Sequence, residues 1–70
     1  MTLGQRISLY RKKLNISQEE LGARLGVSRQ AVSKWETGAA DPSTANLLAL
    51  AKLYGVPAEE LLRGTRSDAG

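Results

Sequence analysis

The chain has 70 residues, of which 41% are hydrophobic and 24% are charged, so it is long enough for one small folded domain and too short for two. Without cysteine or histidine it has no disulfide, no thiolate zinc site and no histidine base, so we expect no metal, no cofactor and no enzyme activity. No apolar run approaches the roughly 18 residues that a membrane span needs, and the N-terminus does not look like a secretion signal. We therefore expect a soluble, cytoplasmic protein without a membrane partner.

The charge is distributed unevenly along the chain. The net charge is +3, with +4 in residues 1–38 and −1 in residues 39–70. A basic half is typical of a protein with a polyanionic partner, although a solvated basic surface gives the same count. The charge alone does not distinguish the two.

The first half of the chain predicts two helices. Apolar residues recur at helical spacing from the start: Leu3, Ile7, Tyr10 and Leu14. Asn15 follows where a left-handed residue would end this helix. Ser17 begins Ser-Gln-Glu-Glu, a capping box in which the Ser17 hydroxyl and the Glu20 carboxylate each satisfy a backbone N–H. The second helix then continues to about residue 25.

Three further helices are predicted in the second half. Gly26 and Val27 form a short break, and Ser28 is the expected N-cap of a helix to about residue 37. Residues 38–42 form a loop, Ser43 starts a fourth helix, and residues 57–63 form a short fifth. The predicted core is Ile7, Leu21, Leu25, Val32, Trp35, Leu47, Leu50 and Leu61. The sequence thus predicts an all-α, compact five-helix bundle in residues 1–63, followed by a flexible tail of residues 64–70.

The third helix has two chemically different sides when its residues are placed 100° apart. Ser28, Ala31, Val32 and Trp35 fall on one side, so Trp35 is expected in the core and not as a stacking platform. The other side is a polar stripe: Arg29, Gln30, Ser33, Lys34 and Thr37. Arginine can pair with guanine and glutamine with adenine in the major groove. We predict base contacts from Arg29, Gln30, Ser33 and Lys34, although any surface helix has some polar face.

Two short helices joined by a turn containing glycine form a helix-turn-helix. Over residues 3–63 the sequence resembles the phage repressor and Cro-type helix-turn-helix regulators, also called the xenobiotic response element family. The segments that carry the resemblance are Ser17-Gln18-Glu19-Glu20-Leu21, Gly26-Val27-Ser28, Val32, Ser33-Lys34-Trp35-Glu36-Thr37-Gly38, Pro42-Ser43, Leu50-Ala51, Gly55-Val56 and Leu61-Leu62. The resemblance implies a lambda-repressor-like fold and a sequence-specific, double-stranded DNA-binding regulator of transcription, with repression as the expected effect.

The resemblance also implies roles for particular residues. Gln18 occupies the first motif position, where similar proteins contact a phosphate. Arg11 and Glu36 match positions that pair near the DNA backbone, so Glu36 is expected to support the DNA contact of Arg11. The expected phosphate contacts are Gln18, Arg11, Ser28 and Thr37. Proteins of this kind bind palindromic operators as pairs, so we expect a weak or DNA-induced homodimer, with Leu48 and Leu53 as its contacts.

Some positions depart from the family pattern. Gly22 replaces the usual alanine. It still permits close helix approach, but it should weaken the second helix by about 0.5–1 kcal/mol. The loop Ala39-Ala40-Asp41 lacks the basic residues of relatives, which predicts weaker nonspecific DNA affinity. We expect Lys12 and Lys13 to be solvated.

The alternative interpretation is a protein-interaction module of the same fold, such as an antitoxin-like or adaptor domain. Leu9, Leu48 and Leu53 lie off the core stripes and would supply its contact patch.

Overall fold

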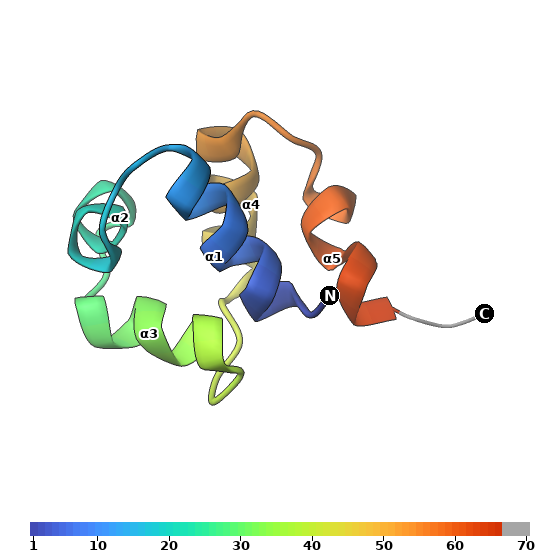
Figure 1. Ribbon diagram of the computed structural model, residues 1–70, viewed down its shortest axis with the longest axis horizontal. Coiled ribbons are helices and arrows are strands. Elements are labelled where there is room, and N and C mark those ends of the chain that lie inside the picture. The colour runs from blue at the N-terminus through green and yellow to red at the C-terminus, as the bar shows by residue number, and fades with distance from the viewer. Residues whose placement is uncertain (67–70) are drawn as a thin grey trace.

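The computed structural model describes residues 1–66, which form five helices joined by short connections (Figure 1). The helices are α1 (Leu3–Lys13), α2 (Gln18–Leu25), α3 (Arg29–Thr37), α4 (Thr44–Tyr54) and α5 (Ala58–Arg66). No strand occurs among the residues that the structure describes, so the predicted all-α five-helix fold is confirmed. Helix α5 continues past Gly64, where we expected it to end, because a helical glycine costs only about 1 kcal/mol. Residues 67–70 of the predicted tail lie outside the described residues, and the division at residue 63 stays a prediction.

Hydroxyl side chains begin four of the helices. The Oγ atoms of Ser17, Ser28 and Ser43 accept hydrogen bonds of 3.0, 3.1 and 3.2 Å from backbone N–H groups three residues on. The reciprocal capping box, however, is at Thr2 and Gln5, which the sequence analysis missed. The predicted second half of the box at Ser17 was wrong.

The Glu20 carboxylate explains that difference. It accepts a hydrogen bond of 2.9 Å from Nε of Arg24, one turn further along α2. A guanidinium is a stronger donor than a neutral backbone N–H, and residues four apart share a helix face. The side chain therefore turns toward Arg24 and leaves the helix start to the Ser17 hydroxyl alone.

The core lies where the five helices meet. Its buried members are Leu3, Ile7, Leu21, Val32, Trp35, Leu50, Ala51 and Leu61. Leu25 and Leu47, predicted as core, are partly buried and pack against it, as does Leu53. Leu14 follows the end of α1 and is 43% exposed. Leu9 and Leu48 are exposed, so two of the three leucines expected off the core are on the surface.

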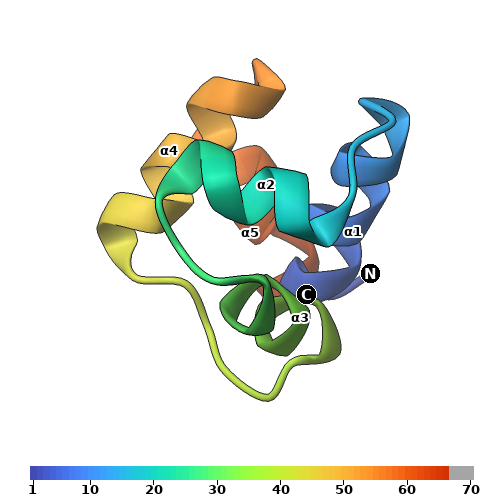
Figure 2. The same ribbon diagram turned by 90° about the vertical axis from the view of Figure 1, so that its left-hand side faces the viewer.

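Helix α3 lies at the edge of the molecule, packed against α1 and α2, so that one long side of it faces outward (Figures 1 and 2). The backbone of its neighbours comes close enough to require glycine. A Cβ atom on Gly22 would lie 2.7 Å from the carbonyl oxygen of Val27, in the turn before α3. A Cβ atom on Gly4 would collide with the Trp35 carbonyl and lie 2.7 Å from that of Glu36. The close approach expected at Gly22 is thus confirmed, and it is tight enough to require glycine.

Candidate nucleic-acid interface

The polar stripe of α3 faces outward. Arg29, Gln30 and Lys34 are exposed and Ser33 is partly buried, while Val32 and Trp35 on the opposite side belong to the core. The predicted division of this helix into two sides is thus confirmed. Within residues 1–63 no side-chain hydrogen bond or ion pair engages any of the four predicted base-contacting side chains. Their donors and acceptors are available to an external partner.

A partly buried ion pair joins α1 to the last turn of α3. Nε of Arg11 donates to Oε2 of Glu36 at 2.7 Å, and its Nη2 donates to Oε1 at 3.3 Å. The two side chains are only 12% and 8% exposed, so the pairing expected from the resemblance is confirmed. The third nitrogen of Arg11, Nη1, donates to the carbonyl oxygen of Ile16 at 2.8 Å. Each of the three guanidinium nitrogens therefore donates a hydrogen bond within the protein.

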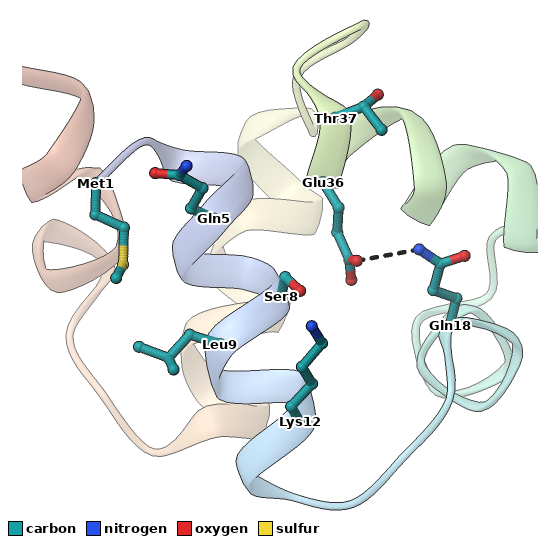
Figure 3. A pocket seen from close by; sticks show the side chains of 8 residues that line it. All are labelled: Met1, Gln5, Ser8, Leu9, Lys12, Gln18, Glu36 and Thr37. Carbon is teal, nitrogen blue, oxygen red and sulfur yellow. Dashed lines mark hydrogen bonds between the residues drawn. The ribbon is translucent and has the colours of Figure 1, made fainter.

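Gln18, the first residue of α2, is a third member of this network. Its Nε2 donates to Oε1 of Glu36 at 3.0 Å (Figure 3). This bond is not predicted from the sequence, although all three residues fall on positions that carry the resemblance or match it. One carboxylate on α3 thereby binds a residue at the end of α1 and another at the start of α2.

The electrostatics of the network favour the ionised pair. Burial by itself would raise the pKa of Glu36, but the hydrogen bonds from Arg11 and Gln18 and the charge of Arg11 outweigh it and lower the pKa. The hydrogen bond to Glu36 likewise raises the pKa of Arg11. Both groups are charged at neutral pH, and together they add no net charge to this surface.

The four predicted phosphate contacts differ in the donors they have left. The amide of Gln18 uses one of its two hydrogens, and the Ser28 hydroxyl accepts the cap bond and keeps its own proton to donate. The Thr37 hydroxyl donates to the Lys34 carbonyl at 3.2 Å and accepts from the N–H of Ala39 at 3.4 Å. Arg11 is held as described above. Three of the five N–H groups of Arg11 are used, so Gln18, Ser28 and Arg11 each have a donor to spare. Thr37 would have to give up its bond to the Lys34 carbonyl.

A groove open to solvent lies between α1, the start of α2 and the end of α3 (Figure 3). It is lined by Met1, Gln5, Ser8, Leu9, Lys12, Gln18, Glu36 and Thr37. Thr37 belongs to the polar stripe of α3 and also to this groove, so the two surfaces are continuous. The groove brings Gln18 and Thr37 together, whereas Ser28 lies at the other end of α3.

The loop between α3 and α4 contributes little charge to this face. Ala39, Ala40 and Asp41 are exposed, and the loop has no basic side chain. Among the described residues, no helix has the length and hydropathy needed to cross a membrane.

Known proteins resemble the chain in both sequence and structure. The family model described as "Helix-turn-helix" matches residues 7–61. Repressor protein C2 of Salmonella phage P22 is 45% identical over 66 residues, which cover 94% of this chain and 31% of that protein. The transcriptional activator BcrR of Enterococcus faecalis is 38% identical over 64 residues, covering 91% of this chain and also 31% of its own length. The chain thus spans about a third of the length of these relatives.

Two solved structures are similar along nearly their whole length. The crystal structure of the P22 c2 repressor in complex with a synthetic operator superimposes with a TM-score of 0.86 at 44% identity, covering 91% of this chain and 97% of that one. The restriction-modification controller protein C.AhdI of Aeromonas hydrophila gives a TM-score of 0.78 at 33% identity, with coverages of 86% and 91%. With the arrangement of α2 and α3 and the match over residues 7–61, these similarities establish that the chain belongs to the helix-turn-helix family.

Proposed function

We propose that this chain is a sequence-specific, double-stranded DNA-binding domain of a transcriptional regulator that acts as a repressor. The observation that carries the proposal is the stripe on α3, where Arg29, Gln30 and Lys34 are exposed and unengaged while the opposite side is anchored in the core. An α-helix presented in this way fits the major groove of B-DNA. The solved complex of the similar P22 c2 repressor with its operator supports this assignment.

Different parts of the face have different tasks in this proposal. Arg29, Gln30, Ser33 and Lys34 contact base edges and supply sequence discrimination. Gln18 and Ser28 donate their remaining hydrogens to phosphates, and Thr37 adds a contact if its hydroxyl releases the Lys34 carbonyl. Arg11, whose charge is balanced by Glu36, presents its remaining N–H groups to the DNA backbone, and the same carboxylate orients Gln18.

We further propose that two copies act together on a palindromic operator, forming a weak or DNA-induced homodimer in the cytoplasm. A single exposed helix touches only a few base pairs, which gives too few contacts for strong discrimination. Leu48 is 56% exposed and is the better dimer contact of the two expected leucines, because Leu53 packs against the core. Half-sites would then lie about one helical turn, or roughly 10 base pairs, apart.

The proposal is tested by selecting bound sites from random duplexes at a fixed salt concentration and then substituting the stripe. Gln30→Ala and Arg29→Ala should each cost about 1–3 kcal/mol on the best site and leave nonspecific affinity nearly intact, because base contacts specify and phosphate contacts do not. Lys52 is an exposed basic residue on α4, and Lys52→Ala is the control. It should change neither the affinity for the best site nor the nonspecific affinity. Equal weakening on every duplex would remove α3 from base reading.

The alternative, a protein-interaction module, is supported by the exposed Leu9 and Leu48. It predicts a tight protein partner and no salt-dependent binding to any duplex. The same duplex titration therefore separates the two functions.

A further inference from the structure

Lys12 lies at the groove between α1, α2 and α3. Its side chain extends from the last turn of α1 toward the side on which Gln18 and Glu36 meet (Figure 3). The sequence alone predicts a solvated Lys12. The structure instead places its ammonium on the same groove as two of the predicted phosphate contacts, Gln18 and Thr37.

The charge balance of the groove favours an anion. Glu36 is the carboxylate that lines it, but its charge is neutralised by the two hydrogen bonds from Arg11. No carboxylate among residues 1–63 lies within 4.0 Å of the Lys12 ammonium. The positive charge of Lys12 is therefore uncompensated, next to an amide donor of Gln18.

The groove adjoins the outward stripe of α3. Thr37 belongs to both surfaces, so a duplex seated on the stripe would also lie beside the groove. The major groove is about 12 Å wide, and its walls are the two sugar-phosphate backbones. A helix in the major groove therefore has phosphates close to both of its sides.

We infer that one strand's backbone runs along this groove and that Lys12 contacts a phosphate in it, which adds a second residue of α1, after Arg11, to the DNA interface. This inference rests on the proposed function. It adds Lys12 to the phosphate contacts and states where one DNA strand lies on the protein. The contact is electrostatic, because an ammonium meets a phosphate as a point charge, and it does not depend on base sequence.

The neighbouring Lys13 is a matched control. Its ammonium lies 5.5 Å from the centre of the Tyr10 ring, and Lys13 is not among the residues that line the groove. Replacing either lysine with glutamine removes one positive charge at adjacent positions, so the long-range field changes almost equally. A difference between the two variants therefore reports local contact with the DNA.

The experiment measures duplex affinity for the wild type, Lys12→Gln, Lys13→Gln and Lys12→Arg at salt concentrations from about 50 to about 400 mM. Lys12→Gln should reduce the salt slope by about 0.9 and weaken binding about five- to tenfold near 0.1 M salt, equally on selected and random duplexes. Lys13→Gln and Lys12→Arg should keep the wild-type slope. Circular dichroism melting checks that all four proteins are folded.

Identical slopes for Lys12→Gln and Lys13→Gln, with wild-type binding intact, would overturn this inference and leave the proposed function standing. A wild-type protein that binds no duplex at any of these salt concentrations would overturn the proposed function and this inference with it. A loss confined to the selected site would overturn the phosphate contact, because it would place Lys12 on a base edge.

Discussion

Glu36 has an unusual number of partners for one side chain, because it accepts hydrogen bonds from two nitrogens of Arg11 and from the amide of Gln18. Since the Glu36 side chain is only 8% exposed, its carboxylate depends on these donors to compensate for the loss of water. Its contribution to the free energy of unfolding should therefore depend on its ionisation.

We predict that the stabilising effect of Glu36 is lost in acid. Its pKa in the folded protein lies below the ordinary value of 4.5, so the unfolded chain takes up the proton first as the pH falls. The contribution of Glu36 to the free energy of unfolding is fully present at pH values above its ordinary pKa. It disappears as the pH falls through the lower pKa of the folded protein. In urea unfolding, the difference in the free energy of unfolding between the wild type and Glu36→Gln should narrow on acidification from neutral pH. A difference that stays constant with pH would contradict a lowered pKa.

Trp35 gives a prediction about packing. Its side chain is 5% exposed on the inner side of α3, so Trp35→Ala should lower the free energy of unfolding by about 3–5 kcal/mol. That loss is comparable to the whole stability of a small domain. Melting followed by circular dichroism is the measurement, with Gln30→Ala on the outer side of the same helix as the control. Near-wild-type melting of Trp35→Ala would show that the site can collapse without cost.

The sequence allowed residue-level predictions only where a pattern or a resemblance existed. The two partners of the Arg11–Glu36 pair are 25 residues apart, and only the resemblance suggested that they meet. The bond from Gln18 depends on which way a side-chain amide turns, and no local pattern encodes that choice. The available signal in the sequence is that Arg11, Gln18 and Glu36 all match family positions near the DNA backbone, which suggests that the three side chains lie close together.

At the scale of helices, close backbone contacts determine where α3 lies. A Cβ atom on Gly22 would be too close to the Val27 carbonyl oxygen, and one on Gly4 would be too close to the carbonyl oxygens of Trp35 and Glu36 at the end of α3. Helix α3 is thus held near both of its ends by contacts that exclude even a methyl group.

We predict that Gly22→Ala destabilises the protein by about 1–3 kcal/mol, the typical cost of overpacking, despite the gain in helix propensity of about 1 kcal/mol. Helix propensity alone gives the opposite sign. The sequence predicts a close approach at Gly22 but does not show that its partner is the Val27 carbonyl, 2.7 Å from an added Cβ atom. Thermal unfolding measures the change. Ala23→Gly is the control. Ala23 is the next residue of α2 and is exposed, so this substitution measures the difference in helix propensity between alanine and glycine without any contact with Val27. A higher melting temperature for Gly22→Ala would mean that the turn yields easily.

Helix starts were the most predictable elements, because Ser17, Ser28 and Ser43 act through bonds to residues three positions away. The side chain of Glu20 was predicted wrongly, since two donors compete for it and only the three-dimensional arrangement decides between them. The end of α5 was missed for a related reason. A glycine signal is weak when the helix is already anchored by a buried residue such as Leu61.

At the scale of the whole molecule, the proposed pairing on DNA makes a prediction about Leu48. Leu48→Glu should reduce affinity for a palindromic duplex and leave affinity for a single half-site unchanged, because the charge disturbs only the contact between copies. Titrations of both duplexes measure this, with Ala23→Glu at an exposed position of α2 as the control that adds the same charge. An equal effect of the two substitutions on the palindrome would exclude Leu48 from the dimer contact.

The network around Glu36 also limits how this module can be used as an engineering part. The helix-turn-helix is often pictured as a portable cassette of two helices, yet here the end of the second helix is held by Arg11 and by the backbone at Gly4, both on α1. A graft of residues 17–38 onto another scaffold would keep its capping serines but would bury an acid without its arginine. The recipient would have to supply a guanidinium and a bare stretch of backbone in the same places, so the smallest transferable part contains α1 as well.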